Sequence, residues 1–275
     1  MALVPFPSAS PTPPDRDEPL IELTDADELE NGGAKMSFLE HLDELRNRLI
    51  ACAWALGVSC LIAYIFINRI FTFVMHPLQE LLPDGGKLVY TEGPEAFMLY
   101  VKIGGLAGLM LAVPFILWQL WLFISPGLYT YEKKFAVPFV LFSTFFFFLG
   151  AVFSHYVAFP WTWKFFISFQ TDYMQFMPKI GPAFSLYVKM MLGFGLIFQM
   201  PTLVFFLSRM GLVSARLLTR HFKYAVLVIF VIAAVISPGT DVMSQLMMAI
   251  PMLGLYALSI LVAFFFGKSS SSEAA

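Results

Sequence analysis

Long apolar runs separated by short polar segments make up most of this chain after residue 50. The runs recur at lengths of about 20 residues, which an α-helix needs to cross a hydrocarbon core of about 30 Å. This pattern predicts an all-α polytopic membrane protein with six transmembrane helices. The first helix is expected to begin in EHLDELRNRLI, to enter the bilayer near Ile50 and to leave it near Phe73. The other five are expected at 96–122, 135–158, 183–208, 222–236 and 242–266.

The last two predicted helices are joined by a linker of only about three residues, Pro238 to Thr240, or five if the end residues 237 and 241 are counted. The run 222–236 holds 15 residues, which make about 22 Å of helix. We therefore expect helices 5 and 6 to be short, with the bilayer thinned around them.

Basic residues predict the orientation of these helices. With the N-terminus inside, eleven of the 17 lysines and arginines lie on the cytoplasmic side and six on the other, as the positive-inside rule requires. Both termini are therefore expected in the cytoplasm (N-in/C-in). The segment after the second helix, which carries Glu132, is then a cytoplasmic loop.

The first 35 residues differ in composition from the rest. They are rich in proline, and eight acids fall between Asp15 and Glu30, so residues 1–35 are predicted to be a disordered, acidic cytoplasmic tail. Residues 36–268 form the predicted membrane domain, and 269–275 a second disordered tail.

An internal repeat links two of the predicted helices. AFMLYVKIGGLAGLMLAVPF (96–115) aligns without gaps to AFSLYVKMMLGFGLIFQMPT (183–202), with nine of twenty positions identical. Both copies start on the predicted outer side, so the repeat is parallel. Each copy carries a proline that is expected to bend its helix in mid-membrane. These prolines are Pro114 and Pro201.

Small and amphipathic side chains add expectations about packing and depth. Gly104 and Gly108 form a small-xxx-small pair that permits close helix contact. Lys102 and Lys189 lie inside their helices and are expected to extend outward to the interface. The Trp161-x-Trp163 pair is typical of an interfacial aromatic belt.

Glu132 stands out because acids are scarce after residue 100. It lies beside two lysines in the predicted loop. It could be a solvated acid paired with one of them, an interaction worth about 0–1 kcal/mol. Alternatively it is a carboxylate that recognises a cation, with an apolar wall beside it. That wall would comprise Phe123, Pro126, Tyr129 and Tyr131.

Glu44 raises the same question on the first helix. It could pair with Arg48 one turn later, worth about 0.3 kcal/mol. Alternatively it shares the cytoplasmic face with Glu132, and the two carboxylates hold two cationic side chains. Gln199, about midway along the fourth helix, either forms an interhelical hydrogen bond or contacts the transmembrane helix of a partner. Asp241 is expected to cap the sixth helix.

No cofactor is expected. The four histidines show no metal-ligand spacing, and we find neither a phosphate-binding loop nor a nucleophile–base pair. The sequence therefore predicts that the protein is not an enzyme and that any energy input comes from outside this chain.

Three motifs in register carry a family resemblance. They are HLDELRNRL at 41–49, P-x-x-L-W-Q-x-W-x-F-I-x-P-G-L-Y ending in YEKK at 114–134, and SPGTDVMSQLMMAIPM at 237–252. Together they resemble TatC, the multispanning receptor subunit of the twin-arginine (Sec-independent) protein translocase. The resemblance covers about residues 36–268.

The resemblance implies a receptor that binds the Arg-Arg signal peptide of folded cargo at the cytoplasmic face. The residues it implies for signal-peptide binding are Glu132, Glu44, Phe123, Tyr131 and Arg46. Pro77 matches a proline of the family's first periplasmic loop. Many members carry glutamate where this chain has Gln199, which leaves a hydrogen-bonding role there but no charge.

The resemblance also implies partners and a location. The partners are TatA-like and TatB-like single-span subunits and further copies of the chain within the complex, and no nucleic acid is expected. The location is the lipid bilayer of the bacterial inner membrane, with both termini in the cytoplasm. The energy source is the proton-motive force. The alternative is a secondary transporter of a small cation or peptide, which the parallel repeat with its prolines would suit. The lack of any acid at mid-membrane depth counts against that alternative.

Overall fold

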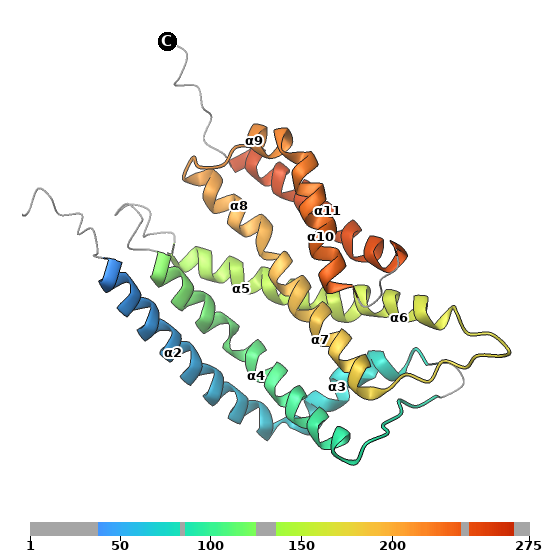
Figure 1. Ribbon diagram of the computed structural model, residues 1–275. Helices are drawn as coiled ribbons and strands as arrows, with labels where there is room; N and C mark the ends of the chain where they lie inside the picture. The colour runs from blue at the N-terminus through green and yellow to red at the C-terminus, as the bar shows by residue number, and fades with distance from the viewer. Residues whose placement is uncertain (1–37, 83–85, 125–135, 238–241, 267–275) are drawn as a thin grey trace, which may run out of the picture. The chain divides into compact units, whose positions relative to one another are not determined.

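The structure, a computed structural model, describes residues 38–82, 86–124, 136–237 and 242–266. The chain divides into two units, Met1–Leu42 and Asp43–Ala275. Of the first unit, only the opening turn of one helix is described. Every named element in the described ranges is a helix (Figure 1). The predicted tails at 1–35 and 269–275 lie outside these ranges and stay predictions.

Six apolar helical segments confirm the predicted membrane fold. Five of them are long and apolar enough to cross a membrane, and a sixth, α10 (Phe222–Ile236), is shorter. The short fifth span is therefore confirmed. α11 (Val242–Phe266) keeps its predicted range, yet its 25 residues make it full length rather than short.

The first predicted span is broken into two helices. α2 (Phe38–Ile65) ends before Phe66, whose backbone leaves helical geometry, and α3 (Ile67–Gln79) turns away from the axis of α2 (Figure 1). The structure thus contradicts a single helix to Phe73. Polar residues at Asn68 and Arg69 explain the turn, because such side chains are costly in hydrocarbon and suit an amphipathic helix at an interface.

α3 buries one face, and Pro77 belongs to it. The buried residues of α3 are Val74, Met75, Pro77 and Leu78. Pro77, expected in a loop, therefore lies inside a helix and packs in the core.

α4 (Gly93–Ile124) is continuous through Pro114, so this proline does not break its helix. α2 packs against α4 through the two predicted glycines. A Cβ atom built on Gly104 would lie 2.8 Å from the ring of Tyr64, and one built on Gly108 would lie 2.7 Å from Cα of Cys60. Only glycine allows the helices to come this close, which confirms the role expected of the pair.

The third span is longer than predicted. α5 (Ala136–Phe153), a π-helical turn η4 (Ser154–Ala158) and α6 (Phe159–Ile167) follow without a gap, so the helix continues past the expected end at 158. His155 in the π-helical turn is buried, and its Nδ1 lies 2.8 Å from the hydroxyl oxygen of Tyr187. This hydrogen bond joins the turn to the fourth span.

The fourth span is interrupted where the repeat predicts a bend. A single residue, Phe198, separates α7 (Ile180–Ile197) from α8 (Gln199–Arg209). Pro201 explains the position, because it lacks an N–H and its ring conflicts with the carbonyl four residues earlier. α5 and α7 are in backbone contact nearby: a Cβ atom on Gly150 would lie 2.9 Å from the carbonyl carbon of Phe194.

A short helix, α9 (Ala215–Arg220), leads into α10, and α11 then packs chiefly against α8 and α10. Two hydrogen bonds from side chains of α11 connect it to α9 and α10. The Tyr256 hydroxyl donates to the carbonyl of Leu218 at 2.8 Å, and Gln245 Nε2 donates to the carbonyl of Phe230 at 2.8 Å. Asp241 lies outside the described residues, so its predicted role as a cap stays a prediction.

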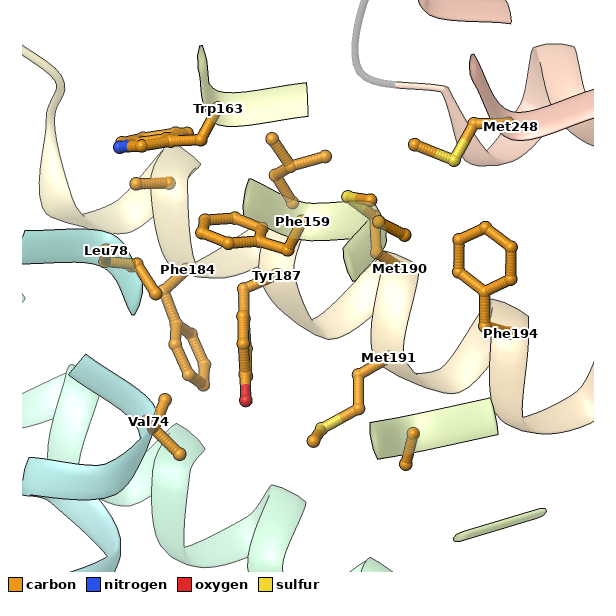
Figure 2. Packing of buried hydrophobic residues seen from close by; sticks show 14 of the residues in the cluster. Val74, Leu78, Phe159, Trp163, Phe184, Tyr187, Met190, Met191, Phe194 and Met248 are labelled. Atoms are coloured by element: carbon orange, nitrogen blue, oxygen red, sulfur yellow. The ribbon is translucent and has the colours of Figure 1, made fainter. Parts of the chain in front are cut away.

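The core centres on α7. Figure 2 shows its side chains meeting Phe159 and Trp163 from α6 and Val74 and Leu78 from α3. The α7 residues labelled there are Phe184, Tyr187, Met190, Met191 and Phe194. α7 is thus the helix on which the first and third spans assemble.

Candidate functional site

An arginine joins the start of α2 to the end of α4. Arg48 Nη2 and Nε donate to Glu44 Oε1 at 2.7 and 3.2 Å, and Arg48 Nη1 donates to Gln119 Oε1 at 3.0 Å. The predicted i,i+4 pair of Glu44 and Arg48 is therefore confirmed. The contact with Gln119 extends the pair to a second helix, at the end predicted to face the cytoplasm.

The Glu44 carboxylate is partly buried, and only one of its two oxygens accepts hydrogen bonds within the described ranges. Its side chain is 16% exposed. Oε1 accepts both bonds from Arg48, whereas Oε2 is buried and accepts no hydrogen bond from the residues that the structure describes. A buried acceptor without a donor is costly, by about 1–3 kcal/mol and more for a charged group. Oε2 is therefore suited to a donor that a ligand supplies.

Phe123 lies one helical turn beyond Gln119, on the same face of α4, and is half-buried. An aromatic cluster of Trp121, Phe139 and Phe206 packs at the same end of α4. The ring centroids of Trp121 and Phe139 are 4.5 Å apart, and those of Phe139 and Phe206 are 4.6 Å apart. This cluster holds together the ends of α4 and α8 and the start of α5.

The other residues assigned to the signal-peptide site are placed less fully. Glu132 and Tyr131 fall within 125–135, outside the described residues, so their position beside Glu44 stays a prediction. Arg46 is exposed on α2. Two residues correspond to about 200° around a helix, so Arg46 and Arg48 point in nearly opposite directions. The contact with α4 is therefore made by Arg48.

Gln199 forms the predicted interhelical hydrogen bond. Its Nε2 donates to the carbonyl oxygen of Ser143 on α5 at 2.8 Å, and the residue is 8% exposed. Gln199 is the first residue of α8, directly after the interruption at Phe198. The bond therefore fastens the start of α8 to α5, and the side chain faces the bundle rather than an outside partner.

Sequence reasoning missed the part played by Gln119. Its signal was a polar side chain near the end of an apolar helix, and such groups usually face other helices. The partner could not be found from spacing, because Arg48 and Gln119 are 71 positions apart.

Comparisons with known proteins agree over most of the chain. The family model for "Sec-independent protein translocase protein (TatC)" matches residues 40–251. A curated protein of that name from Desulforapulum autotrophicum is 43% identical over 239 residues, which cover 87% of this chain and 88% of that protein. One from Helicobacter pylori strain J99 is 41% identical over 223 residues, 81% of this chain and 87% of that protein.

Solved structures give the same result. A crystal structure described as the twin-arginine translocase receptor TatC superposes with a TM-score of 0.72 at 34% identity, covering 82% of this chain and 98% of the other. A second crystal structure of that receptor, in the detergent DDM, has a TM-score of 0.73 at 33% identity, with coverage of 82% and 99%.

Proposed function

Because the chain belongs to the TatC family of Sec-independent protein translocases, we propose that Glu44 and Glu132 bind the Arg-Arg pair of a signal peptide. The protein is the multispanning receptor and core subunit of a twin-arginine translocase, not an enzyme. The peptide belongs to a folded cargo protein and is recognised at the cytoplasmic end of the helices. Phe123 and Tyr131 shape the pocket around it.

One observation carries the proposal: Oε2 of Glu44 is buried without a donor among the described residues, while Arg48, itself bonded to Gln119, holds the other oxygen in place. A receptor for arginine needs a carboxylate that is oriented before the ligand arrives. Arginine offers a planar fork that can grip a carboxylate with two hydrogen bonds, and lysine does not. Oε1 of Glu44 already accepts from Arg48, so an arginine of the signal peptide grips this carboxylate with two bonds only when it displaces Arg48 from Oε1.

The charged contacts need help from apolar surface. Each charge-assisted pair contributes about 1.5–3 kcal/mol when partly desolvated, so two pairs give about 3–6 kcal/mol. Micromolar binding requires about 8 kcal/mol. The remaining ~2–5 kcal/mol corresponds to burial of roughly 90–200 Å² of apolar surface, before the entropic cost of association. The apolar stretch of the signal peptide supplies this surface by lying along the spans.

The chain is a multi-pass membrane protein of a multicomponent translocase. Its proposed partners are TatA-like and TatB-like single-span subunits and further copies of itself, with the proton-motive force as the energy source. The proposed location is the bacterial inner membrane with both termini in the cytoplasm, which the excess of lysine and arginine on that side supports.

The transporter alternative gains nothing from the comparisons. The parallel repeat that suggested it has a packing role here, because Gly108 and Gly195 occupy matching positions and both lie at close helix contacts. In the first copy the neighbour is Cys60 of α2, and in the second it is Phe147 of α5.

Glu44→Gln is expected to weaken binding of an Arg-Arg signal peptide by about tenfold or more, because one charge-assisted pair is lost. The measurement is fluorescence anisotropy of a labelled peptide with protein in nanodiscs. Asp43→Asn is the matched control, since it removes the neighbouring exposed acid of α2 and is expected to bind as the wild type does.

A thermal unfolding midpoint recorded for each variant separates loss of binding from loss of structure. Glu44→Gln protein that melts as the wild type does and still binds with full affinity would contradict the proposed role of Glu44.

A further inference from the structure

A cavity of about 470 Å³ opens at the predicted outer end of the bundle, between the end of α6 and the first turns of α7. Its walls include Trp163, Phe166, Phe176, Lys179, Leu186 and Lys189. Apart from the two lysines, these walls are mainly apolar and aromatic. The volume lies within the range of about 300–1,000 Å³ that is usual for ligand pockets.

The two lysines are not held in ion pairs in the part of the chain that the structure describes. Both are exposed, and neither takes part in an ion pair there. Glu95 interacts electrostatically with Lys179, but its oxygens accept hydrogen bonds from the backbone N–H groups of Thr91 and Gly181, each at 3.1 Å. The carboxylate is thus held by the backbone, and Lys179 keeps its charge available for another anion.

The spacing of the lysines suits a ligand that reaches from the interface into the bilayer. Lys189 lies ten residues after Lys179, about 15 Å further along α7. A lysine at such a depth extends its ammonium back toward the interface along its helix. Both ammonium groups can therefore approach one anion at the level of the lipid head groups, with the apolar wall of the cavity below it.

Trp163 supplies a second observation at the same cavity. It is only 3% exposed, so it does not belong to the interfacial belt predicted for it, whereas Trp161 is 62% exposed and suits that belt. The Trp163 ring is held by Phe159 and Phe176, with ring centroids 5.2 and 5.4 Å away. Its buried Nε1–H has no acceptor among the described residues, so a polar donor at the cavity wall lacks a partner.

We propose that this cavity binds one anionic phospholipid. The phosphate lies between Lys179 and Lys189, a lipid oxygen accepts from Trp163 Nε1, and an acyl chain follows the apolar wall formed by Phe166 and Leu186. The cavity is too small for a whole phospholipid, so the chains continue along the apolar helix faces. This site is independent of signal-peptide recognition, which lies at the opposite end of the helices.

The choice of an anionic lipid follows from the charges. Two lysines attract a phosphate, and basic residues near a membrane surface favour an anionic lipid. A zwitterionic phosphatidylcholine carries its own cation, which two neighbouring ammonium groups repel. Among the described residues no acid lines the cavity, so no carboxylate there offsets the two lysines when a choline group approaches.

The test is native mass spectrometry of delipidated full-length protein titrated with phosphatidylglycerol or phosphatidylcholine. The wild type is expected to bind one phosphatidylglycerol at least about tenfold more tightly than phosphatidylcholine, and Lys179→Gln/Lys189→Gln is expected to lose this preference. Lys102→Gln/Lys164→Gln removes two exposed lysines of the same predicted side that do not line the cavity and is expected to bind as the wild type does.

Trp163→Phe keeps an aromatic ring and removes the donor, and is expected to weaken phosphatidylglycerol binding about two- to tenfold. Three results would overturn the proposal: equal binding by the two double variants, no preference for the anionic lipid in the wild type, or unchanged affinity in Trp163→Phe. If glycerol 3-phosphate alone displaced the lipid with equal affinity, the cavity would be a site for a soluble anion and the lipid proposal would also fail.

Discussion

Replacing Glu132 with alanine is expected to cut the export of twin-arginine cargo by at least about tenfold. The loss removes one of two carboxylates proposed to hold the Arg-Arg pair, a contact worth about 1.5–3 kcal/mol. Alanine leaves no acceptor at the position, and Lys133 and Lys134 beside it then repel the incoming arginines. The measurement is pulse-chase export of a folded reporter in cells whose only copy of this subunit carries the change.

A matched control keeps this test specific. Asp172→Asn removes an exposed acid on the predicted outer side and is expected to export at the normal rate. Abundance of each variant in the membrane must be equal, so that export reports recognition. Normal export by Glu132→Ala at normal abundance would falsify the central role of Glu132.

Gly108→Ala is expected to separate α2 from α4 and to lower the free energy of unfolding by about 1–3 kcal/mol. The added Cβ would lie 2.7 Å from Cα and 2.8 Å from the backbone nitrogen of Cys60. Backbone atoms cannot move aside as the end of a flexible side chain can, so the whole helix must shift. The shift also pulls Arg48 from Gln119, so binding of the signal peptide is expected to weaken in the same variant.

Gly105→Ala is the matched control for this prediction. The two glycines belong to the same helix, and a Cβ on Gly105 would meet nothing within 4 Å. Alanine is a better helix former than glycine by about 0.5–1 kcal/mol, so Gly105→Ala is expected to be neutral or slightly stabilising. Thermal unfolding in one detergent compares the two variants, and equal midpoints would contradict the close packing of α2 on α4.

The weak attachment of α2 explains why one methyl group matters so much. Of the 18 most apolar consecutive residues of the first span, only 6% are buried, against 50% in the span made by α7 and α8. α2 therefore depends on a few contacts with α4, which include the two glycines, the Arg48–Gln119 hydrogen bond and the bond from the Tyr64 hydroxyl to the carbonyl of Val101 at 3.3 Å. The helix that carries Glu44 is held at few points, so each contact has a large effect on the site.

The hydrophobic pattern predicted the bounds of a helix well where polar segments flank an apolar run of suitable length. α10 and α11 have the predicted ranges, because polar or proline-containing segments flank both. Pro201 predicted a bend where the structure has the interruption between α7 and α8, and the small-xxx-small pair predicted the close contact at Gly108, since both follow from local backbone chemistry.

Tertiary context decided the remainder of the fold. Asn68 and Arg69 favour a turn after Phe66, but the apolar residues on both sides of them read as one span, and the direction of α3 depends on burying one of its faces against the core. The π-helical turn at Ser154–Ala158 likewise has no pattern in the sequence, because its place is set by the contact between His155 and Tyr187.

The candidate site was predictable only where its contacts join residues that are close in the chain. The Glu44–Arg48 pair is local and follows from helical spacing. Its connection to Gln119 joins residues far apart in the chain and required the packing of α2 on α4. The place of Glu132 relative to Glu44 rests on the family resemblance.

The most direct test of the account compares an Arg-Arg signal peptide with its Lys-Lys version, binding to purified protein in nanodiscs. The wild type is expected to prefer Arg-Arg by about tenfold or more, or about 1.4 kcal/mol, and Glu132→Gln is expected to lose this preference. Equal binding of both peptides by both proteins would contradict the claim that these carboxylates read the twin arginines.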